Sequence, residues 1–260
     1  MQMICALLVF QTPELPAPLG RLSPWLDWLG TPRHELFARL EAQEHRRFIK
    51  THTPLDGIAL DPVATYIVVG RHPLDMAVSL YHQGENIDRA RLAELTGQPA
   101  PAPAPPRPPL HRWLLDWIDG PGSPAQQLDS LPGVAWHASD AWARRREPNI
   151  VLVHYDDLCA DLEGEMRRLA AVLDITVAEA AWPVLVEAAG FEAMRAAAER
   201  RAPDPADILK DRALFFRRGS SGAGREVLSV DEWAHYEARV ASLAPTPVVS
   251  WLHHDGERAA

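Results

Sequence analysis

Two short polar segments carry side chains whose types and spacing suit the handling of an anion and a proton. Lys50 and His52 stand two residues apart. A histidine has an unperturbed pKa of about 6.5, so it can take a proton from a reacting hydroxyl at neutral pH. Arg71 and Ser79 form the second pair, and both side chains can donate hydrogen bonds to phosphate oxygens. These residue types suit a general base and an anion-binding site.

A third cluster lies near the carboxyl end, where Arg217, Arg218 and Gly219 precede two serines and another glycine. Successive backbone N–H groups in a glycine loop can form an anion-binding concavity, and two guanidinium groups add positive charge. Each of the three clusters also has a purely structural explanation. His52 would then be a surface histidine, the Arg71 and Ser79 pair an ordinary helix start, and the third cluster a mobile basic loop.

Strands must position these clusters, and two segments read clearly as strands. Residues 63–70 (VATYIVVG) and 149–155 (NIVLVHY) are apolar and rich in β-branched side chains, as expected of parallel strands buried on both faces. A weaker β-like run covers residues 46–52. Pro73 follows the first strand at a position suited to a helix start, and Asp156 and Asp157 follow the second, where a helix N-terminus favours anions. The pattern predicts an α/β fold with a parallel sheet and ligands at the carboxyl ends of its strands.

The remaining pattern is largely helical. Apolar spacings of three and four predict helices over residues 34–43, 111–118, 158–173, 177–199 with an interruption near Trp182 and Pro183, and 230–243. Trp113 and Trp117, four residues apart, are expected to pack in the core. Seven prolines between residues 98 and 109 predict an extended surface loop, although such a segment could also bind a proline-recognising module.

Composition limits the class of protein. The 260 residues carry a net charge of −9, which argues against a general nucleic-acid binder and against a polybasic membrane anchor. The apolar run from Met3 to Phe10 is far shorter than the roughly 20 residues that cross a bilayer. The two cysteines, Cys5 and Cys159, are too few for a zinc cluster and are expected to be small buried hydrophobes. A cytoplasmic protein without stable membrane insertion is the expectation.

Four segments in this order carry a resemblance. They are Phe48 to Pro54 (FIKTHTP), Tyr66 to Ser79 (YIVVGRHPLDMAVS), His154 to Leu158 (HYDDL) and Phe216 to Gly219 (FRRG). The chain resembles the sulfotransferases that use 3′-phosphoadenosine 5′-phosphosulfate (PAPS), and within them the actinobacterial glycolipid sulfotransferases. The resemblance implies sulfuryl transfer from PAPS to a hydroxyl of a small-molecule or glycolipid acceptor, without a metal.

The resemblance also implies roles for individual residues. His52 would accept the acceptor's proton and Lys50 would lie close to the sulfonate. The implied co-substrate-binding residues are Arg71 and Ser79 at the 3′-phosphate, Tyr155 and Phe191 beside the adenine, and Arg217, Arg218 and Gly219 in the phosphate loop.

The chain departs from the family pattern at three places. The carboxyl-terminal loop usually continues as Gly-Asp-Trp-Lys, but Gly222 is followed here by Ala223, Gly224 and Arg225. Ala189 stands where the family often has a threonine. The amino-terminal loop that grips the 5′-phosphosulfate is not seen, and residues 1–10 resemble the helix that follows it.

We therefore expect one sulfotransferase-like domain over residues 1–260, truncated at its amino terminus. Its fold would be a P-loop-type parallel sheet flanked by helices that misses its first central strand. The chain would be poorly active or inactive and only marginally stable. The alternative is a non-catalytic truncated homologue that binds adenosine 3′,5′-bisphosphate or a partner protein. The acceptor and the oligomeric state are left open, and Trp25 and Trp28 are compatible with an apolar or glycolipid acceptor.

Overall fold

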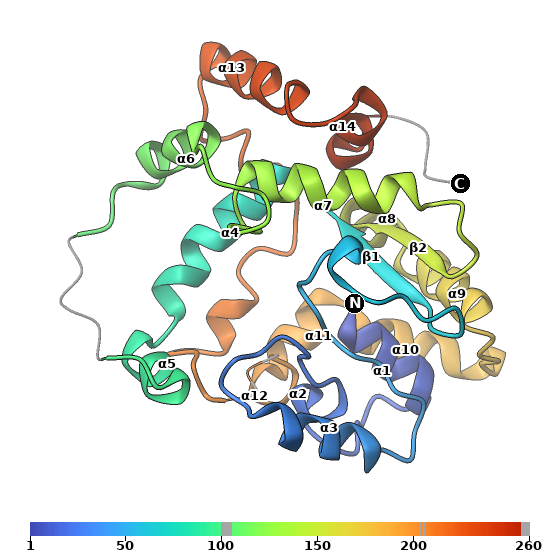
Figure 1. Ribbon diagram of the computed structural model, residues 1–260. Coiled ribbons are helices and arrows are strands. Elements are labelled where there is room, and N and C mark those ends of the chain that lie inside the picture. The colour runs from blue at the N-terminus through green and yellow to red at the C-terminus, as the bar shows by residue number, and fades with distance from the viewer. Residues whose placement is uncertain (100–105, 203, 205, 256–260) are drawn as a thin grey trace. The chain divides into compact units, whose positions relative to one another are not determined.

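A computed structural model describes residues 1–99, 106–202, 204 and 206–255 (Figure 1). The chain forms two compact units, and each is built from three separate segments. Unit 1 comprises Met1–Thr51, Gln83–Pro105 and Asp161–Gly219, and unit 2 comprises His52–His82, Pro106–Ala160 and Ser220–Ala260. The expectation of a single domain over the whole chain stays a prediction.

Unit 2 contains the sheet found in the described residues, and it has two parallel strands, β1 (Tyr66–Gly70) and β2 (Ile150–His154). The register pairs Tyr66 with Ile150 and Gly70 with His154, so both strands end at the same edge. Every residue of β2 is buried, as its apolar sequence requires. The predicted parallel α/β arrangement is confirmed. Strand β1 is shorter than predicted because the Asp61 carboxylate accepts the backbone N–H of Val63 at 2.9 Å, which closes a turn just before the strand.

Helices of unit 2 pack against the sheet. Helices α7 (Leu131–Ala143) and α14 (Thr246–His253) lie near the two strands (Figure 1). They share with β1 and β2 a cluster of buried residues that includes Ala138, Val68, Leu152 and Trp251. The other elements of this unit are η1 (Leu55–Gly57), α6 (Leu110–Asp119), α7 (Leu131–Ala143), α8 (Tyr155–Ala160), α13 (Val230–Ala241) and α14 (Thr246–His253). Helix α4 (Pro73–Asn86) begins here and ends in unit 1. Trp117 is buried and Trp113 packs against the same cluster, which confirms their predicted core role.

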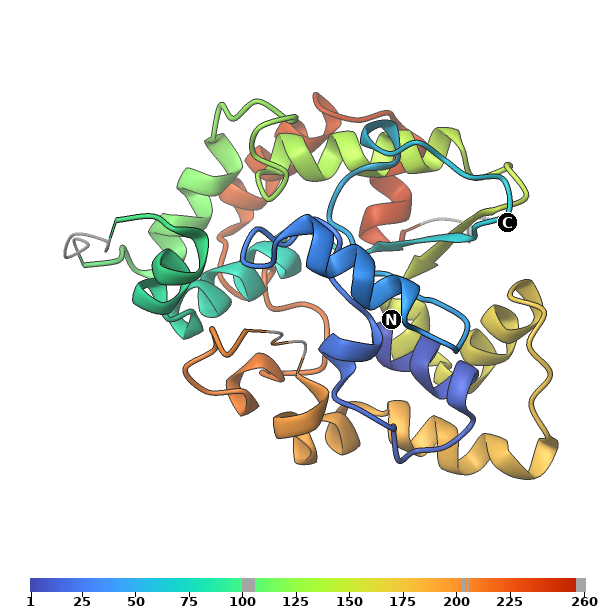
Figure 2. The same ribbon diagram turned by 60° about the horizontal axis from the view of Figure 1, so that its bottom comes forward.

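The regular elements among the described residues of unit 1 are helices, which are joined by loops and by two isolated β-bridges, Trp25 with Lys50 and Ile87 with Leu209. Helix α1 (Gln2–Phe10) contacts α2 (Leu19–Leu22), α9 (Leu162–Val172) and α10 (Trp182–Ala189). It lies beside the gold helices in both views (Figures 1 and 2). The other elements are α2 (Leu19–Leu22), α3 (Arg33–Glu41), α5 (Arg89–Thr96), α9 (Leu162–Val172), η2 (Glu179–Ala181), α10 (Trp182–Ala189), α11 (Phe191–Ala196), α12 (Ala198–Arg201) and η3 (Ala213–Phe215). The expected helix over residues 1–10 is confirmed by α1.

Three sequence-based expectations are wrong in detail. Residues 46–52 form no strand, because only Lys50 pairs, in a single parallel bridge with Trp25. The helix expected over residues 158–173 is two helices, since Asp161 accepts the Gly164 backbone N–H at 2.8 Å and caps a new start. Pro183 does not interrupt a helix but lies in the first turn of α10.

The expected burial of the cysteines is also wrong, since Cys159 is exposed and Cys5 is only partly buried. Of the expected proline-rich surface loop, residues 100–105 lie outside the described residues, and residues 98, 99 and 106–109 have neither helix nor strand. No helix among the described residues has the length and apolar character needed to cross a bilayer.

Candidate functional site

Arg71 is the centre of a polar cluster at the carboxyl end of β1, in unit 2. Its Nη1 donates to the Ser79 Oγ at 3.3 Å, which joins the strand end to the second turn of α4. Its guanidinium carbon lies 4.2 Å from the centre of the Tyr155 ring, and its Nη2 donates to the Ser220 carbonyl at 3.3 Å. The structure therefore brings together three of the predicted site residues, Arg71, Ser79 and Tyr155.

The fourth feature of Arg71 is an unsatisfied donor. Its buried Nε has no hydrogen-bond partner among the described residues. A buried N–H of a charged group without a partner costs free energy, and an anionic ligand would remove that cost. The hydrogen-bond donors of Arg71 and Ser79 therefore suit an anionic phosphate group better than an uncharged ligand group.

Tyr155 stands at the junction of β2 and α8, directly after the strand that pairs with β1. Burial raises the pKa of its hydroxyl to about 12, with a smaller contribution from the neighbouring Cys159, while Arg71 acts in the opposite direction. The ring is thus a neutral aromatic face at physiological pH. Such a face can stack on a guanidinium on one side and on a flat ligand on the other.

A buried carboxylate that the sequence pattern did not single out lies in the first turn of α4. Asp75 is only 2% exposed, and its two oxygens accept the backbone N–H groups of Gly222 at 2.7 Å and Gly224 at 2.8 Å. A second carboxylate, Asp156, accepts the hydroxyl of Ser221. The chain from Ser220 to Gly224 is therefore fastened to the two turns that follow β1 and β2. An aspartate two residues after a helix-starting proline was the only sequence signal for this role.

His72 follows Arg71 and is held among aromatic rings. Its ring stacks on that of His253, with centres 4.6 Å apart and planes 13° apart, and on that of Trp233 at 5.7 Å. Burial, and to a smaller extent the neighbouring His253, lower the pKa of His72 to about 4, although Asp75, Asp156 and Asp255 oppose the shift. The His72 ring is therefore neutral at physiological pH, and its role is to pack against the aromatic rings next to Arg71.

The two predicted catalytic residues, Lys50 and His52, lie outside the Arg71 cluster and differ in their surroundings. In unit 1, the Lys50 Nζ lies 4.1 Å from the centre of the Trp25 ring, and that ring stacks on Trp28 at 5.1 Å. Burial lowers the pKa of Lys50, and Asp27 partly opposes this. His52 opens unit 2 and has an exposed side chain just before η1.

The basic loop residues of unit 1 are Arg217, Arg218 and Gly219. Both arginines are exposed, and Gly219 has a φ of 69°, in the left-handed region. A Cβ built on Gly219 would lie 2.5 Å from the Cγ of Phe191, so the loop backbone runs directly against that ring. The structure thus places Phe191 and Gly219 together, and Phe191 also meets Phe216 edge-on at 6.2 Å.

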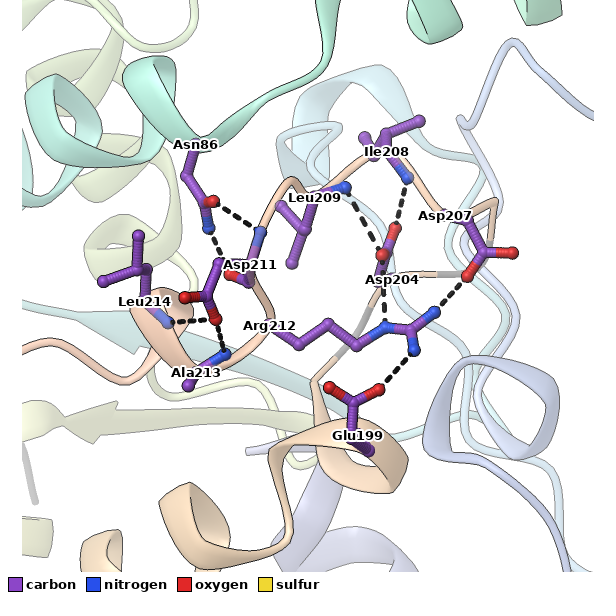
Figure 3. A network of polar contacts seen from close by, with 10 residues as sticks. All are labelled: Asn86, Glu199, Asp204, Asp207, Ile208, Leu209, Asp211, Arg212, Ala213 and Leu214. Atoms are coloured by element: carbon purple, nitrogen blue, oxygen red, sulfur yellow. Dashed lines mark hydrogen bonds and ion pairs between the residues drawn. The ribbon is translucent and has the colours of Figure 1, made fainter.

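A polar network in unit 1 fixes the segment that leads into this loop (Figure 3). The Asn86 side chain, 5% exposed, donates to the Asp211 carbonyl at 2.7 Å and accepts the Asp211 N–H at 3.0 Å. Arg212 forms ion pairs with Glu199 at 2.7 Å, Asp204 at 3.4 Å and Asp207. The end of α4 and the segment after α12 are thereby locked together.

One group in the described residues has the composition of a metal site. Ligand atoms of His154, Asp156 and His254 lie within 4.8 Å of one another. However, the His154 Nδ1 accepts the Asp156 backbone N–H at 3.2 Å, and its Nε2 lies 3.3 Å from the Leu252 carbonyl, to which it donates. Neither nitrogen then directs a lone pair at an ion, and His154 is better explained as a buried structural residue.

Known proteins are similar to this chain in sequence and in fold. A family model described as the sulfotransferase domain matches residues 4–240. The chain is 39% identical to glycolipid sulfotransferases of Mycobacterium bovis and Mycobacterium tuberculosis, and the alignments cover 99% of this chain and 84% of each relative. Luciferin sulfotransferase of Photinus pyralis is 25% identical, over 85% of this chain and 60% of that one.

Solved structures agree on the fold. Mouse sulfotransferase SULT7A1 complexed with PAP has a TM-score of 0.68 at 16% identity, covering 98% of this chain and 84% of that one. Retinol dehydratase with androsterone and the inactive cofactor PAP has a TM-score of 0.68 at 18% identity, covering 94% and 76%. With the family model matching most of its length, the chain belongs to the sulfotransferase family.

Proposed function

We propose that this protein transfers a sulfuryl group from PAPS to a hydroxyl of a glycolipid or a related small molecule. The observation that carries the proposal is the Arg71 cluster. A guanidinium at a strand end, held by Ser79 and Tyr155 and keeping one buried N–H without a partner, suits a phosphate next to an aromatic base. The 39% identity to mycobacterial glycolipid sulfotransferases supports the class of acceptor.

Each predicted residue has a proposed task. Arg71 and Ser79 bind the 3′-phosphate, and Tyr155 lies beside the adenine. Lys50 supplies positive charge near the sulfonate, and His52 takes the proton. Phe191, Arg217, Arg218 and Gly219 belong to the co-substrate-binding set, with Phe191 near the adenine and the loop residues near phosphate.

PAPS supplies an activated sulfonate whose leaving group is the 5′-phosphate. The acceptor oxygen forms its bond to sulfur as the bond between sulfur and that phosphate oxygen breaks. The proton of the acceptor hydroxyl passes to the His52 imidazole, and adenosine 3′,5′-bisphosphate is released. The protein contributes orientation and positive charge around the developing phosphate, which provide most of the gain in such a transfer.

The acceptor surface proposed is the stacked pair Trp25 and Trp28. Their rings lie 5.1 Å apart beside Lys50, so they offer apolar area next to a cation. Aromatic rings of this kind bind the apolar parts of sugars and lipids. A cytoplasmic location stays a prediction, which cell fractionation would check.

The experiment combines binding with turnover. Calorimetry with adenosine 3′,5′-bisphosphate should show binding by the wild type and a loss of about 10- to 100-fold for Arg71→Ala, since hydrogen bonds to charged groups contribute about 1.5 to 3 kcal/mol. Labelled sulfate from PAPS should appear on a glycolipid in preference to phenols and sterols. Binding that does not change in Arg71→Ala would refute the proposed phosphate site. Bisphosphate binding without any transfer would favour the non-catalytic alternative.

A further inference from the structure

We propose that Asp75 is a positioning residue for the 3′-phosphate site, acting through the loop from Ser220 to Gly224 on the guanidinium of Arg71. This inference rests on the proposed function of Arg71. It gives the buried Asp75 carboxylate and the loop a role in selecting nucleotides that carry a 3′-phosphate.

The first step is the way Asp75 holds the loop. Both carboxylate oxygens accept backbone N–H groups, from Gly222 at 2.7 Å and from Gly224 at 2.8 Å, and the side chain is almost fully buried. Charge-assisted hydrogen bonds to backbone N–H groups are short and strong, and here they satisfy both oxygens of a carboxylate that is out of water. A two-point attachment fixes the loop's orientation as well as its distance.

The second step is that the loop sequence fits this attachment. Gly222 has a φ of 95°, which favours glycine. A Cβ on Gly224 would lie 2.3 Å from the Cβ of Leu74 and 2.9 Å from its carbonyl carbon. Only glycine allows the backbone to come so close to the first turn of α4. The departure from Gly-Asp-Trp-Lys at Gly224 therefore has a structural reason in this chain.

The third step connects the loop to the phosphate site. The Ser220 carbonyl accepts from the Arg71 Nη2 at 3.3 Å, so the loop holds one side of the guanidinium. Ser79 and the Tyr155 ring hold two other sides, and the Nε is left without a partner. If the loop moved, the Arg71 guanidinium would lose its hydrogen bond to Ser220, which helps to fix its orientation over the Tyr155 ring. Asp75 therefore fixes the loop backbone, and the loop backbone in turn orients the Arg71 guanidinium.

The test compares two nucleotides on the full chain. Adenosine 3′,5′-bisphosphate carries the 3′-phosphate, and adenosine 5′-monophosphate does not. Asp75→Asn preserves shape but replaces one acceptor by a donor that faces a backbone N–H. We expect it to weaken bisphosphate binding at least ~10-fold and to change monophosphate binding less than ~3-fold. A merely structural defect would weaken both nucleotides alike.

A double-mutant cycle with Arg71→Ala makes the test specific. If Asp75 acts through Arg71, Asp75→Asn should add less than about 2-fold to the loss in the Arg71→Ala background. Asp88→Asn is the matched control, because Asp88 also accepts two backbone N–H groups, from Ala90 and Arg91, but lies at the start of α5. It should leave both affinities unchanged. Should Asp75→Asn not fold, Gly222→Ala disturbs the same loop through its backbone alone and should give the same selective loss.

The outcomes separate the two proposals. Three results would overturn the role of Asp75 while leaving that of Arg71 in place. Asp75→Asn could weaken the binding of both nucleotides equally, or it could weaken neither. In the double variant, the losses of affinity from Asp75→Asn and Arg71→Ala could multiply, as they do for independent sites. A wild type that binds the bisphosphate no better than the monophosphate, or an Arg71→Ala variant that keeps the preference, would overturn the proposed phosphate site itself.

Discussion

The partly buried His72, which follows Arg71 in the sequence, should make folding sensitive to acid. His72 has a pKa of about 4 in the folded protein against 6.5 for the free side chain, mainly through burial and then through the neighbouring His253. Between these values the unfolded state binds more protons than the folded state, so stability rises with pH in this window and falls as the pH drops from 6.5 toward 4. Linkage with these two pKa values gives a loss of about 2 kcal/mol on going from about pH 8 to about pH 5.

The perturbation that isolates this contribution is His72→Phe, which keeps an aromatic ring between His253 and Trp233 but cannot be protonated. Urea unfolding followed by tryptophan fluorescence gives the free energy of unfolding at each pH. The wild type should lose about 2 kcal/mol more than the variant over this range. His34→Gln, at an exposed histidine, is the control and should follow the wild type. A variant whose stability falls with acid as steeply as that of the wild type would refute the reasoning.

Three further changes test the positions of single residues. Gly219→Ala should abolish bisphosphate binding or unfold the loop, because a Cβ there would meet the Phe191 ring at 2.5 Å with a φ of 69°; wild-type affinity in calorimetry would contradict this. Asn86→Ala should lower the free energy of unfolding by about 2 to 3 kcal/mol, because the buried Asn86 side chain loses two hydrogen bonds with Asp211; a change under about 0.5 kcal/mol in urea unfolding would oppose it. Tyr155→Phe should keep bisphosphate affinity within about 3-fold while Tyr155→Ala loses more, because the ring rather than its hydroxyl faces the guanidinium; equal losses in calorimetry would speak against a stacking role.

Local sequence determined the parts of this protein that depend on neighbouring residues. The apolar, β-branched runs predicted both parallel strands, since such residues fit strands buried on two faces. Pro73 marked the start of α4, and the apolar run at residues 1–10 marked α1. Errors occurred where a single side chain decided the outcome, as at Asp61, which shortens β1, and at Asp161, which caps α9.

Only the tertiary structure decided which distant residues meet. Arg71 and Ser79 are close in sequence and could be paired from it, but the carbonyl of Ser220 and the ring of Tyr155 reach Arg71 through the packing of separate segments. Asp75 gave no distinct signal, because an acidic residue in a first helical turn is common and its two backbone donors lie well over a hundred residues away along the chain. The lowered pKa of His72 likewise depends on rings brought by the carboxyl-terminal helices. Sequence patterns report short-range preferences, whereas burial and long-range hydrogen bonds exist only once the chain has folded.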